Sequence, residues 1–205
     1  MRSGVIGGSF DPIHLGHLLI AEEARIALDL AEVVFIPAGQ PWMKQEMTMS
    51  PAHHRLNMVR LGVSSNPFFT ASSREVDREG PTYTVDTLEE LCGEGVGGTD
   101  LFFILGADAL ERLHLWKDPE RILELCTLVA VPRPGSDTLD LSLMDHVSPS
   151  AREKIVLLEG PLLDISATDI RTRAARGMSI HYRVPEQVER YIHRYRLYAE
   201  VEDAA

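Results

Sequence analysis

The sequence has few of the residues that mark disulfide-stabilised or metal-binding proteins. It contains only two cysteines, Cys92 and Cys126, in 205 residues, and they form neither a CxxC pair nor a cluster with metal-ligand spacing. Both lie in apolar stretches, so we expect them to behave as small buried apolar residues in a reducing compartment. A disulfide scaffold and a structural zinc site are therefore excluded.

Positive charge is also scarce. The chain has 20 Lys and Arg against 31 Asp and Glu, a formal charge of −11. A nucleic-acid partner requires a basic face, so this balance argues against one. It does not argue against a nucleotide, because one triphosphate needs only a small pocket of positive potential.

Long apolar runs are missing as well. No run approaches the length that spans a bilayer, so we expect no membrane partner. Residues 1–4 lead directly into a motif and leave no room for a signal peptide, which favours the cytoplasm. With 44% apolar and 25% charged residues, the composition is that of an ordinary globular protein. We expect one domain over 1–205, with a helical C-terminal portion at about 166–198 packed on it.

Short apolar runs alternate with longer segments of helical period. The runs that predict buried strands are 5–6, 33–36, 68–70, 101–105, 128–131 and 155–158. The segments that predict helices are 15–29, 51–64, 84–93, 118–125, 168–176 and 185–195. Such alternation predicts an α/β fold with an open, doubly wound, Rossmann-like parallel sheet.

Three segments do not fit this alternation. Residues 38–50 carry glycine, proline, tryptophan and three methionines, which predicts a long mobile loop. Residues 93–98 are rich in glycine but lack a following Lys-Ser/Thr pair, so they predict a plain turn. Residues 132–152 predict an irregular excursion with one short helix.

The most informative stretch is Gly7-Gly8-Ser9-Phe10-Asp11-Pro12-Ile13-His14-Leu15-Gly16-His17, directly after the first apolar run. A strand that enters glycines and then opens a helix presents main-chain N–H groups to phosphate. His14 and His17 are three residues apart, which places both imidazoles on one helix face. The stretch therefore predicts a nucleotide-handling enzyme.

A second stretch, Ile165-Ser166-Ala167-Thr168-Asp169-Ile170-Arg171, has a related logic. Ser166 or Thr168 is suited to cap a helix whose N-terminus faces a triphosphate. Arg171 offers a forked, permanently charged donor for a leaving pyrophosphate.

The first stretch resembles the HxGH signature of the nucleotidyltransferase superfamily, and the second resembles that superfamily's IS[ST]TxIR motif. Two further stretches indicate which family of this superfamily the chain resembles. They are Gly80–Leu88 and Gly106–Leu110, the latter followed by Trp116-Lys117. Together they are similar to the bacterial nicotinate-nucleotide adenylyltransferases, over nearly the whole chain.

The resemblance implies transfer of an adenylyl group from ATP to nicotinate mononucleotide, with release of pyrophosphate, in NAD biosynthesis. It implies His14, His17 and Arg171 as catalytic residues. The ATP-binding residues that it implies are Gly7, Gly8, Ser9, Phe10, His14, His17, Lys44, Ile165, Ser166, Thr168 and Arg171. Lys44 is the weakest of these, because Pro41-Trp42-Met43-Lys44 replaces the family's Pro-Pro-His-Lys-like stretch. We expect Mg²⁺ to be bound mainly through phosphates and water, and the sequence identifies no protein metal ligand.

The acceptor is expected in the middle of the chain. Thr84 is predicted to cap the helix over 85–93, whose positive end suits a carboxylate. Trp116, or more weakly Tyr83, is suited to stack on a pyridine ring. The resemblance adds Asp108 and Arg133 as contacts of the mononucleotide.

Several other readings stay open at this stage. Asp11 is at least as well suited to cap the turn into Pro12 as to touch metal. Histidines 53, 54, 114, 181 and 193 show no ligand spacing and are expected on the surface. Nicotinamide mononucleotide or phosphopantetheine as acceptor, a cytidylyl donor, a non-catalytic nucleotide-binding module and an aminoacyl-tRNA synthetase fragment are the alternatives. The chain is too short and acidic for the last. A homo-oligomer is a further expectation from the resemblance.

Overall fold

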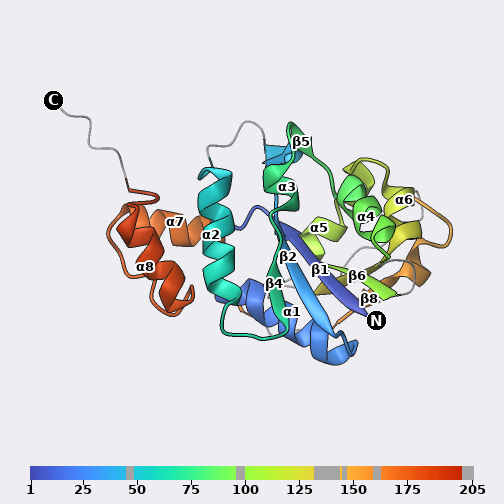
Figure 1. The fold of residues 1–205 in the computed structure, drawn as a ribbon, viewed down its shortest axis with the longest axis horizontal. Coiled ribbons are helices and arrows are strands. Elements are labelled where there is room, and N and C mark those ends of the chain that lie inside the picture. The colour runs from blue at the N-terminus through green and yellow to red at the C-terminus, as the bar shows by residue number, and fades with distance from the viewer. Residues whose placement is uncertain (45–48, 96–99, 132–143, 145–146, 159–162, 200–205) are drawn as a thin grey trace.

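The computed structural model describes residues 1–44, 49–95, 100–131, 144, 147–158 and 163–199 (Figure 1). The strands are β1 Ser3–Gly8, β2 Glu32–Pro37, β3 Gln40–Pro41, β4 Phe69–Ala71, β5 Pro81–Thr82, β6 Leu101–Gly106, β7 Thr127–Val131 and β8 Ile155–Leu157. The α-helices are α1 Leu15–Ala27, α2 Ala52–Val63, α3 Arg74–Asp77, α4 Thr84–Gly93, α5 Ala107–Leu110, α6 Pro119–Leu125, α7 Ala167–Ala175 and α8 Glu186–Arg194. Short 3₁₀ turns are η1 Trp42–Lys44, η3 Leu113–Leu115 and η5 Ala151–Lys154.

Six strands form one parallel sheet in the order β4-β2-β1-β6-β7-β8. The chain therefore builds outward from β1 to one edge, then crosses back and builds outward from β6 to the other. This is the doubly wound order of a Rossmann-like fold, so the predicted fold class is confirmed. The reversal places a switch point between β1 and β6, where Ile6 lies opposite Ile104.

Alternate residues of the central strands supply two separate cores. Ile6 of β1 and Ile104 of β6 face the core that α1 and α2 cover, whereas Val5 and Phe103 face the core under α4 and α6. Figure 1 shows these two pairs of helices on opposite sides of the strands. Because both faces are covered, the strands are apolar throughout, which is the pattern that predicted them.

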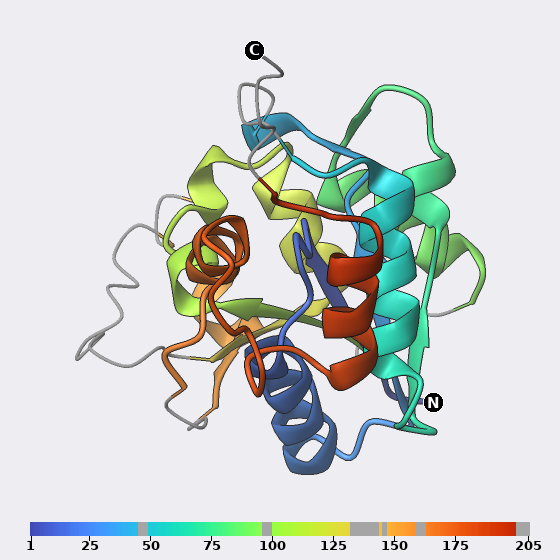
Figure 2. The ribbon, with the colours of Figure 1, turned by 90° about the vertical axis from the view of Figure 1, so that its left-hand side faces the viewer.

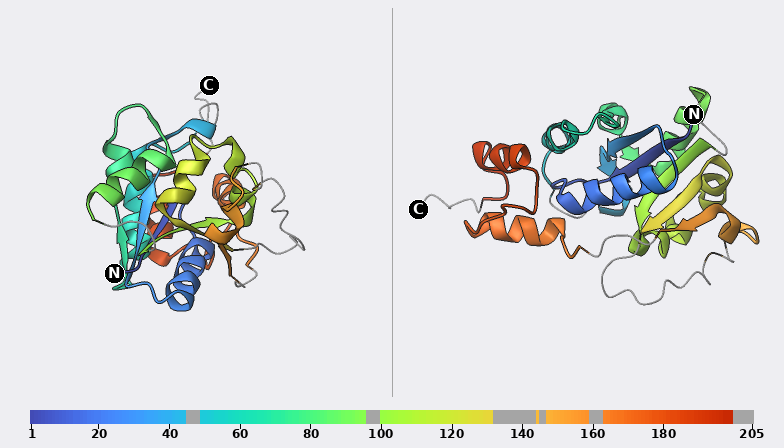
Figure 3. Two further views of the ribbon diagram at one scale, coloured as in Figure 1. Left: turned by 90° about the vertical axis from the view of Figure 1, so that its right-hand side faces the viewer. Right: turned by 90° about the horizontal axis from the view of Figure 1, so that it is seen from below.

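The C-terminal helices extend the first of these cores. Ile170 of α7 and Val188 and Ile192 of α8 belong to the same apolar cluster as α1 and α2. Figure 2 shows α8 running beside α2, and the right-hand view of Figure 3 shows α7 and α8 together at one end of the molecule. Side chains of α7 and α8 thus share one apolar cluster with α1 and α2.

Two segments differ from the sequence prediction. The segment expected as a loop over 38–50 contains β3 and η1, and β3 pairs in parallel with β5. The pair of two-residue strands is too short to leave an alternating pattern in the sequence. Of 93–98, residues 96–98 lie outside the described residues, and so does most of 132–152, although η5 falls at the end of the latter.

The burial of the cysteines and of one histidine agrees only partly with the sequence prediction. Cys126 is fully buried as expected, and burial raises the pKa of its thiol to about 12, whereas Cys92 is only half-buried. His54 was expected on the surface but is half-buried, where its ring Nδ1 lies 2.8 Å from the Tyr191 hydroxyl. His54 is on α2 and Tyr191 is on α8. The sequence did not predict that these helices pack together, and this packing is why His54 is partly buried. No helix among the described residues is long and apolar enough to cross a membrane.

Gly39 provides a test of how tightly the β2–β3 connection is packed. A Cβ atom at this position would lie 2.1 Å from the main-chain oxygen of Glu75, and main chain cannot move aside cheaply. We expect Gly39→Ala to lower the free energy of unfolding by about 2–3 kcal/mol. Gly93→Ala is the control, because nothing lies within 4 Å of a Cβ there and alanine is favoured at a helical position. Urea unfolding checks both, and equal stability of the two variants would contradict the packing.

Candidate active site

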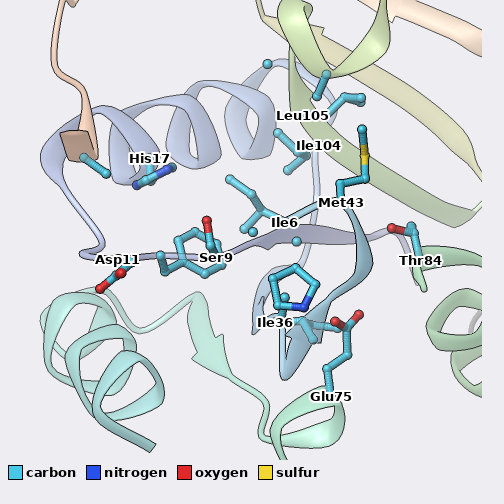
Figure 4. A pocket seen from close by; sticks show the side chains of 18 of the residues that line it. Ile6, Ser9, Asp11, His17, Ile36, Met43, Glu75, Thr84, Ile104 and Leu105 are labelled. Carbon is cyan, nitrogen blue, oxygen red and sulfur yellow. The ribbon is translucent and has the colours of Figure 1, made fainter. Parts of the chain in front are cut away.

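A cavity of about 490 Å³ opens at the carboxyl ends of β1 and β6, beside the switch point of the sheet. Open α/β sheets bind ligands in this position. Its walls come from the β1–α1 turn, from the end of β6 and from the starts of α4 and α7. Figure 4 shows side chains from these separate elements pointing into the same space. The cavity thus gathers both sequence motifs at one place.

The glycine turn after β1 forms the floor of the cavity. Gly7, Gly8, Ser9 and Phe10 all line it. Phe10 has a φ of +46°, in the left-handed region that a bulky residue seldom adopts. Its ring is buried and contacts the His17 ring edge-to-face at 5.0 Å. The turn is therefore held in its shape by the packing of a side chain against the first turn of α1.

His14 and His17 lie on one face at the start of α1, as their spacing predicts. Their rings stack with centroids 3.6 Å apart. The His14 N–H donates to His17 Nδ1 at 3.2 Å, so His17 also takes part in capping the helix. A Cβ on Gly16 would lie 3.1 Å from His14 Nδ1, so the glycine leaves room for the ring. Both histidines line the cavity.

The second motif meets the first at Asp11 and Arg171. Ser166 caps α7 by accepting the Asp169 N–H at 3.1 Å, which decides between the two expected caps. Thr168 instead accepts from Arg171 Nη2 at 3.2 Å. The other arm of Arg171 donates to the main-chain oxygen of Asp11 at 2.8 Å. Residues 160 positions apart in sequence are thereby joined at the edge of the cavity.

The Asp11 side chain is 3% exposed and has partners on both oxygens. Oδ2 accepts the Ser50 N–H at 3.0 Å and Oδ1 accepts the Tyr198 hydroxyl at 2.7 Å. This carboxylate joins two segments that are distant in sequence, so neither contact is the local cap of the turn into Pro12 that the sequence suggested. Among the described residues no group of three His, Cys, Asp or Glu side chains is close enough to hold a metal ion.

The residues expected to bind the acceptor lie at the far end of the cavity. Thr84, Asp108 and Trp116 line it, and the Trp116 ring packs edge-to-face on Phe103 at 6.1 Å. Tyr83 is not among the lining residues; its ring lies 6.0 Å from Trp42 and under the Lys117 ammonium. Of the five residues expected to bind the acceptor, Thr84, Asp108 and Trp116 therefore line the cavity, Tyr83 does not, and Arg133 lies outside the described residues.

One prediction at this wall was wrong. Thr84 does not cap α4; it is the first residue of the helix, and the extended residue Tyr83 is the cap. No side chain accepts a hydrogen bond from the first turn. The lead-in residues set the cap one position earlier because Tyr83 continues the extended backbone of β5. The helix N-terminus still faces the cavity through Thr84.

The structure does not show three other predicted site residues in the cavity wall. Arg133 and the side chain of Lys44 lie outside what the structure describes. Ile165 is not among the lining residues, and its Cβ lies 3.9 Å from where Gly16 would carry one. It contacts the helix that carries the histidines rather than the cavity itself.

Comparison with known proteins identifies the family and the fold. The cytidylyltransferase-like family model matches residues 5–173. A protein of Roseiflexus sp. named probable nicotinate-nucleotide adenylyltransferase is 49% identical over 195 residues, covering 95% of this chain and 96% of that protein. A Leifsonia xyli protein of the same name is 47% identical, covering 98% of this chain and 95% of its own length. The chain belongs to the nicotinate-nucleotide adenylyltransferase family.

Solved structures agree on the fold of this nucleotidyltransferase. Plasmodium falciparum nicotinic acid mononucleotide adenylyltransferase, solved in complex with NaAD, superposes with a TM-score of 0.73 and covers 96% of this chain and 97% of that chain. The sequence identity is 19%, so this likeness is one of architecture.

A buried arginine organises the enzyme's cavity, and the sequence analysis missed it. Arg55 of α2 is 1% exposed. Its guanidinium donates to four main-chain oxygens: Ser9 at 2.8 Å, Ala38 at 2.6 Å, Gly39 at 2.9 Å and Ser50 at 2.9 Å. Burial lowers its pKa, and the Asp11 carboxylate opposes that shift. One side chain thus ties the glycine turn to two other loops.

A buried carboxyl was also missed. Glu75 of α3 is 8% exposed, lines the cavity and accepts the Thr87 hydroxyl at 2.8 Å. Arg78 in turn donates to Thr87 Oγ1 at 3.1 Å. Burial raises the pKa of Glu75. Figure 4 shows its carboxyl beside Ile36, at the side of the cavity where Thr84 lies. Glu75 is therefore a buried carboxyl on that side of the cavity, whereas the Asp108 side chain is exposed.

The sequence carries one signal for Arg55. It stands three, four and seven positions before Met58, Val59 and Gly62, which form the buried stripe of α2. A charged residue on an apolar helical stripe is a candidate for a buried donor to main chain. Glu75 has no comparable signal, because its helix has only four residues.

We expect Arg55→Lys to lower the free energy of unfolding by about 3 kcal/mol, because an ammonium cannot reach all four oxygens and leaves some of them unsatisfied. Arg60→Lys on the exposed side of the same helix is the matched control and should stay within about 0.5 kcal/mol. Chemical unfolding of the two variants measures the difference. If Arg55→Lys is as stable as Arg60→Lys, the guanidinium does not hold the three loops together.

Proposed function

We propose that this enzyme transfers an adenylyl group from ATP to nicotinate mononucleotide, giving nicotinate adenine dinucleotide and pyrophosphate in NAD biosynthesis. One observation carries the proposal. The glycine turn, both histidines and Arg171 come together around a single cavity at the switch point of the sheet. The names of the relatives, at 43–49% identity over nearly full length, support the choice of acceptor.

The reaction sets a limited chemical task. An oxygen of the acceptor's phosphate attacks the α-phosphorus of ATP, and a new P–O bond forms. The bond from that phosphorus to the bridging oxygen of the β-phosphate breaks, and its electron pair leaves with pyrophosphate. The attacking oxygen is already anionic, so no strong base is required. Catalysis then depends on bringing two anions together and stabilising the leaving charge.

The residues at the first motif have the chemistry for this task. Main-chain N–H groups of the turn at Ser9 and Phe10 and the imidazoles of His14 and His17 are donors for phosphate oxygens. Arg171, in the middle of α7, adds a permanent positive charge in a forked geometry. We assign Gly7, Gly8, Ser166 and Thr168 to the same ATP site through their positions in the cavity wall.

The opposite wall has the chemistry for a pyridine carboxylate. The N-terminus of α4 at Thr84 offers partial positive charge and main-chain donors. Trp116 presents an aromatic ring to the same part of the cavity, suited to stack on the pyridine. We assign Asp108 to this acceptor site, with Tyr83 supporting it from outside.

Magnesium enters the proposal as part of the MgATP substrate. It prefers an octahedral shell in which it keeps several waters. The Asp11 oxygens are engaged by Ser50 and Tyr198, and the cavity residues in the described ranges form no ligand cluster. We therefore expect the ion to be held mainly by the phosphates and water and to enter the cavity bound to ATP.

A pyrophosphate-release assay tests the assignment. ATP is supplied with nicotinate mononucleotide, with its amide or with phosphopantetheine in parallel, and CTP replaces ATP in a fourth series. The proposal predicts release with ATP and nicotinate mononucleotide well above the other pairs. No release with that pair under conditions where the protein is folded would reject the proposal.

The histidines give a sharper test, because one of them also caps a helix. Replacing His17 with glutamine keeps a side chain that is suited to reach the His14 N–H but removes the imidazole. We expect His17→Gln to keep its melting temperature within a few degrees while turnover falls about a hundredfold or more, the loss typical of one donor to developing charge. His14→Asn is the corresponding change at the cap. Turnover within about threefold of the parent in both variants would remove the histidines from the catalytic set.

The α4 terminus predicts a preference for the acid over the amide. A carboxylate gains from the helix N-terminus, whereas the amide presents its own N–H₂ donors to main-chain N–H groups. Poor pairing of such groups costs roughly 1–3 kcal/mol each, so kcat/KM for nicotinate mononucleotide should exceed that for the amide at least about tenfold. Equal values for the two mononucleotides would reject the acceptor assignment and leave adenylyl transfer itself standing.

A further inference from the structure

The chain after α8 returns to the first motif. Tyr198 is 187 positions beyond Asp11, and its hydroxyl donates to Asp11 Oδ1 at 2.7 Å. Burial and the Asp11 carboxylate raise the pKa of this hydroxyl, so it remains a protonated donor. The residue lies beyond the part of the chain that the family model matches, which ends at residue 173. A C-terminal side chain thus touches the turn that forms the cavity floor.

The main chain adopts unfavourable conformations to make this contact. Arg196 has a φ of +49° and Tyr198 a φ of +69°, both in the left-handed region. For residues other than glycine this region costs of order 1 kcal/mol each. The segment is anchored by Leu197, which packs against the apolar core and whose N–H donates to the Ile192 oxygen at 3.0 Å. Such strain persists only where surrounding contacts determine the conformation.

Asp11 connects Tyr198 to the cationic side of the cavity. Its carboxylate is bound on one oxygen by Tyr198 and on the other by the Ser50 N–H. Its main-chain oxygen accepts one arm of Arg171 at 2.8 Å. The orientation of this peptide group therefore sets the direction of the Arg171 fork. Removal of the Tyr198 hydroxyl leaves Asp11 Oδ1 without this donor. The Asp11 main-chain oxygen, which accepts from Arg171, is then held less firmly.

We propose that Tyr198 is a positioning residue for adenylyl transfer, which acts through Asp11 to aim Arg171 at the triphosphate. The inference rests on the proposed function, because it concerns the same site. It assigns a kinetic role to the C-terminal segment and predicts that this role concerns ATP rather than the acceptor, because Figure 4 shows Thr84 on the side of the cavity away from Asp11 and His17.

The test begins with Tyr198→Phe, which keeps the ring and removes one hydroxyl. Tyr195→Phe is the matched control, three residues earlier in the same segment with a ring that packs on Tyr191. Loss of a hydrogen bond to a buried carboxylate predicts a fall of about tenfold in kcat/KM for ATP. The KM for nicotinate mononucleotide should change less than about twofold, and Tyr195→Phe should match the parent in both. A rise in the KM for nicotinate mononucleotide as large as the rise in the KM for ATP would overturn the proposal.

A double-mutant cycle separates positioning from general stability. If Tyr198 acts through Arg171, then adding Tyr198→Phe to Arg171→Lys should lower kcat/KM for ATP by less than about twofold further, although it costs about tenfold in the parent. Effects that multiply would show that Tyr198 acts independently of Arg171 and would overturn the proposal. Arg171→Lys alone should impair use of ATP more than use of the mononucleotide.

Two controls keep the outcome decisive. Parent activity with ATP and nicotinate mononucleotide is measured first, and its absence would reject the proposed function, whereas an active parent with an unaffected Tyr198→Phe rejects only this inference. If Tyr198→Phe does not fold, Asp11→Asn weakens the same contact from the other side, because an amide has one acceptor oxygen for two donors. The same ATP-specific loss is expected from it, and normal use of ATP by a folded Asp11→Asn enzyme would overturn the proposal.

Discussion

Four main-chain oxygens converge on the guanidinium of Arg55, and the shape of the cavity depends on that contact. At the switch point of a doubly wound sheet, the loops after neighbouring strands separate and leave peptide groups without strand partners. Here those groups belong to the glycine turn, to the β2–β3 connection and to Ser50, two residues before α2. A single buried charge satisfies them together. The geometry of the glycine turn is therefore a property of three loops rather than of its glycines alone.

Asp11 performs the complementary task on the other side of the turn. Arg55 gathers carbonyl groups, whereas the Asp11 carboxylate accepts an N–H and a hydroxyl from segments far apart in sequence. The two side chains carry opposite charge, and the Asp11 charge opposes the fall in the pKa of Arg55 that burial causes. Beside this pair, Arg171 and helix N-termini supply positive potential around the cavity of a chain whose net charge is −11.

The sequence predicted most of the fold, because strands covered on both faces are apolar throughout and the helices between them have clear start signals. Pro51 and Pro119, for example, mark the starts of α2 and α6. It did not predict β3 and β5, whose pairing depends on Gly39 approaching the main chain of Glu75. It placed the cap of α4 one residue too late, because a tyrosine in extended conformation carries no capping signal.

The candidate site was predicted where residues belong to local motifs and missed where they do not. Gly7 through His17 and Ser166 through Arg171 are contiguous, so spacing alone indicates their chemistry. Arg55, Glu75 and Tyr198 are single residues whose partners come from distant segments, and only the fold brings them together. A cytoplasmic location and a homo-oligomeric state stay predictions, because the contacts within a single chain determine neither of them.

The central claim is that the enzyme transfers the adenylyl group of ATP, rather than its terminal phosphate, to the mononucleotide. It is tested most directly with ATP that carries a radioactive label on either the α- or the γ-phosphate, incubated with nicotinate mononucleotide and the enzyme. The account predicts that the α-label appears in a dinucleotide and the γ-label in pyrophosphate. Transfer of the γ-label to the mononucleotide, or appearance of ADP, would contradict it.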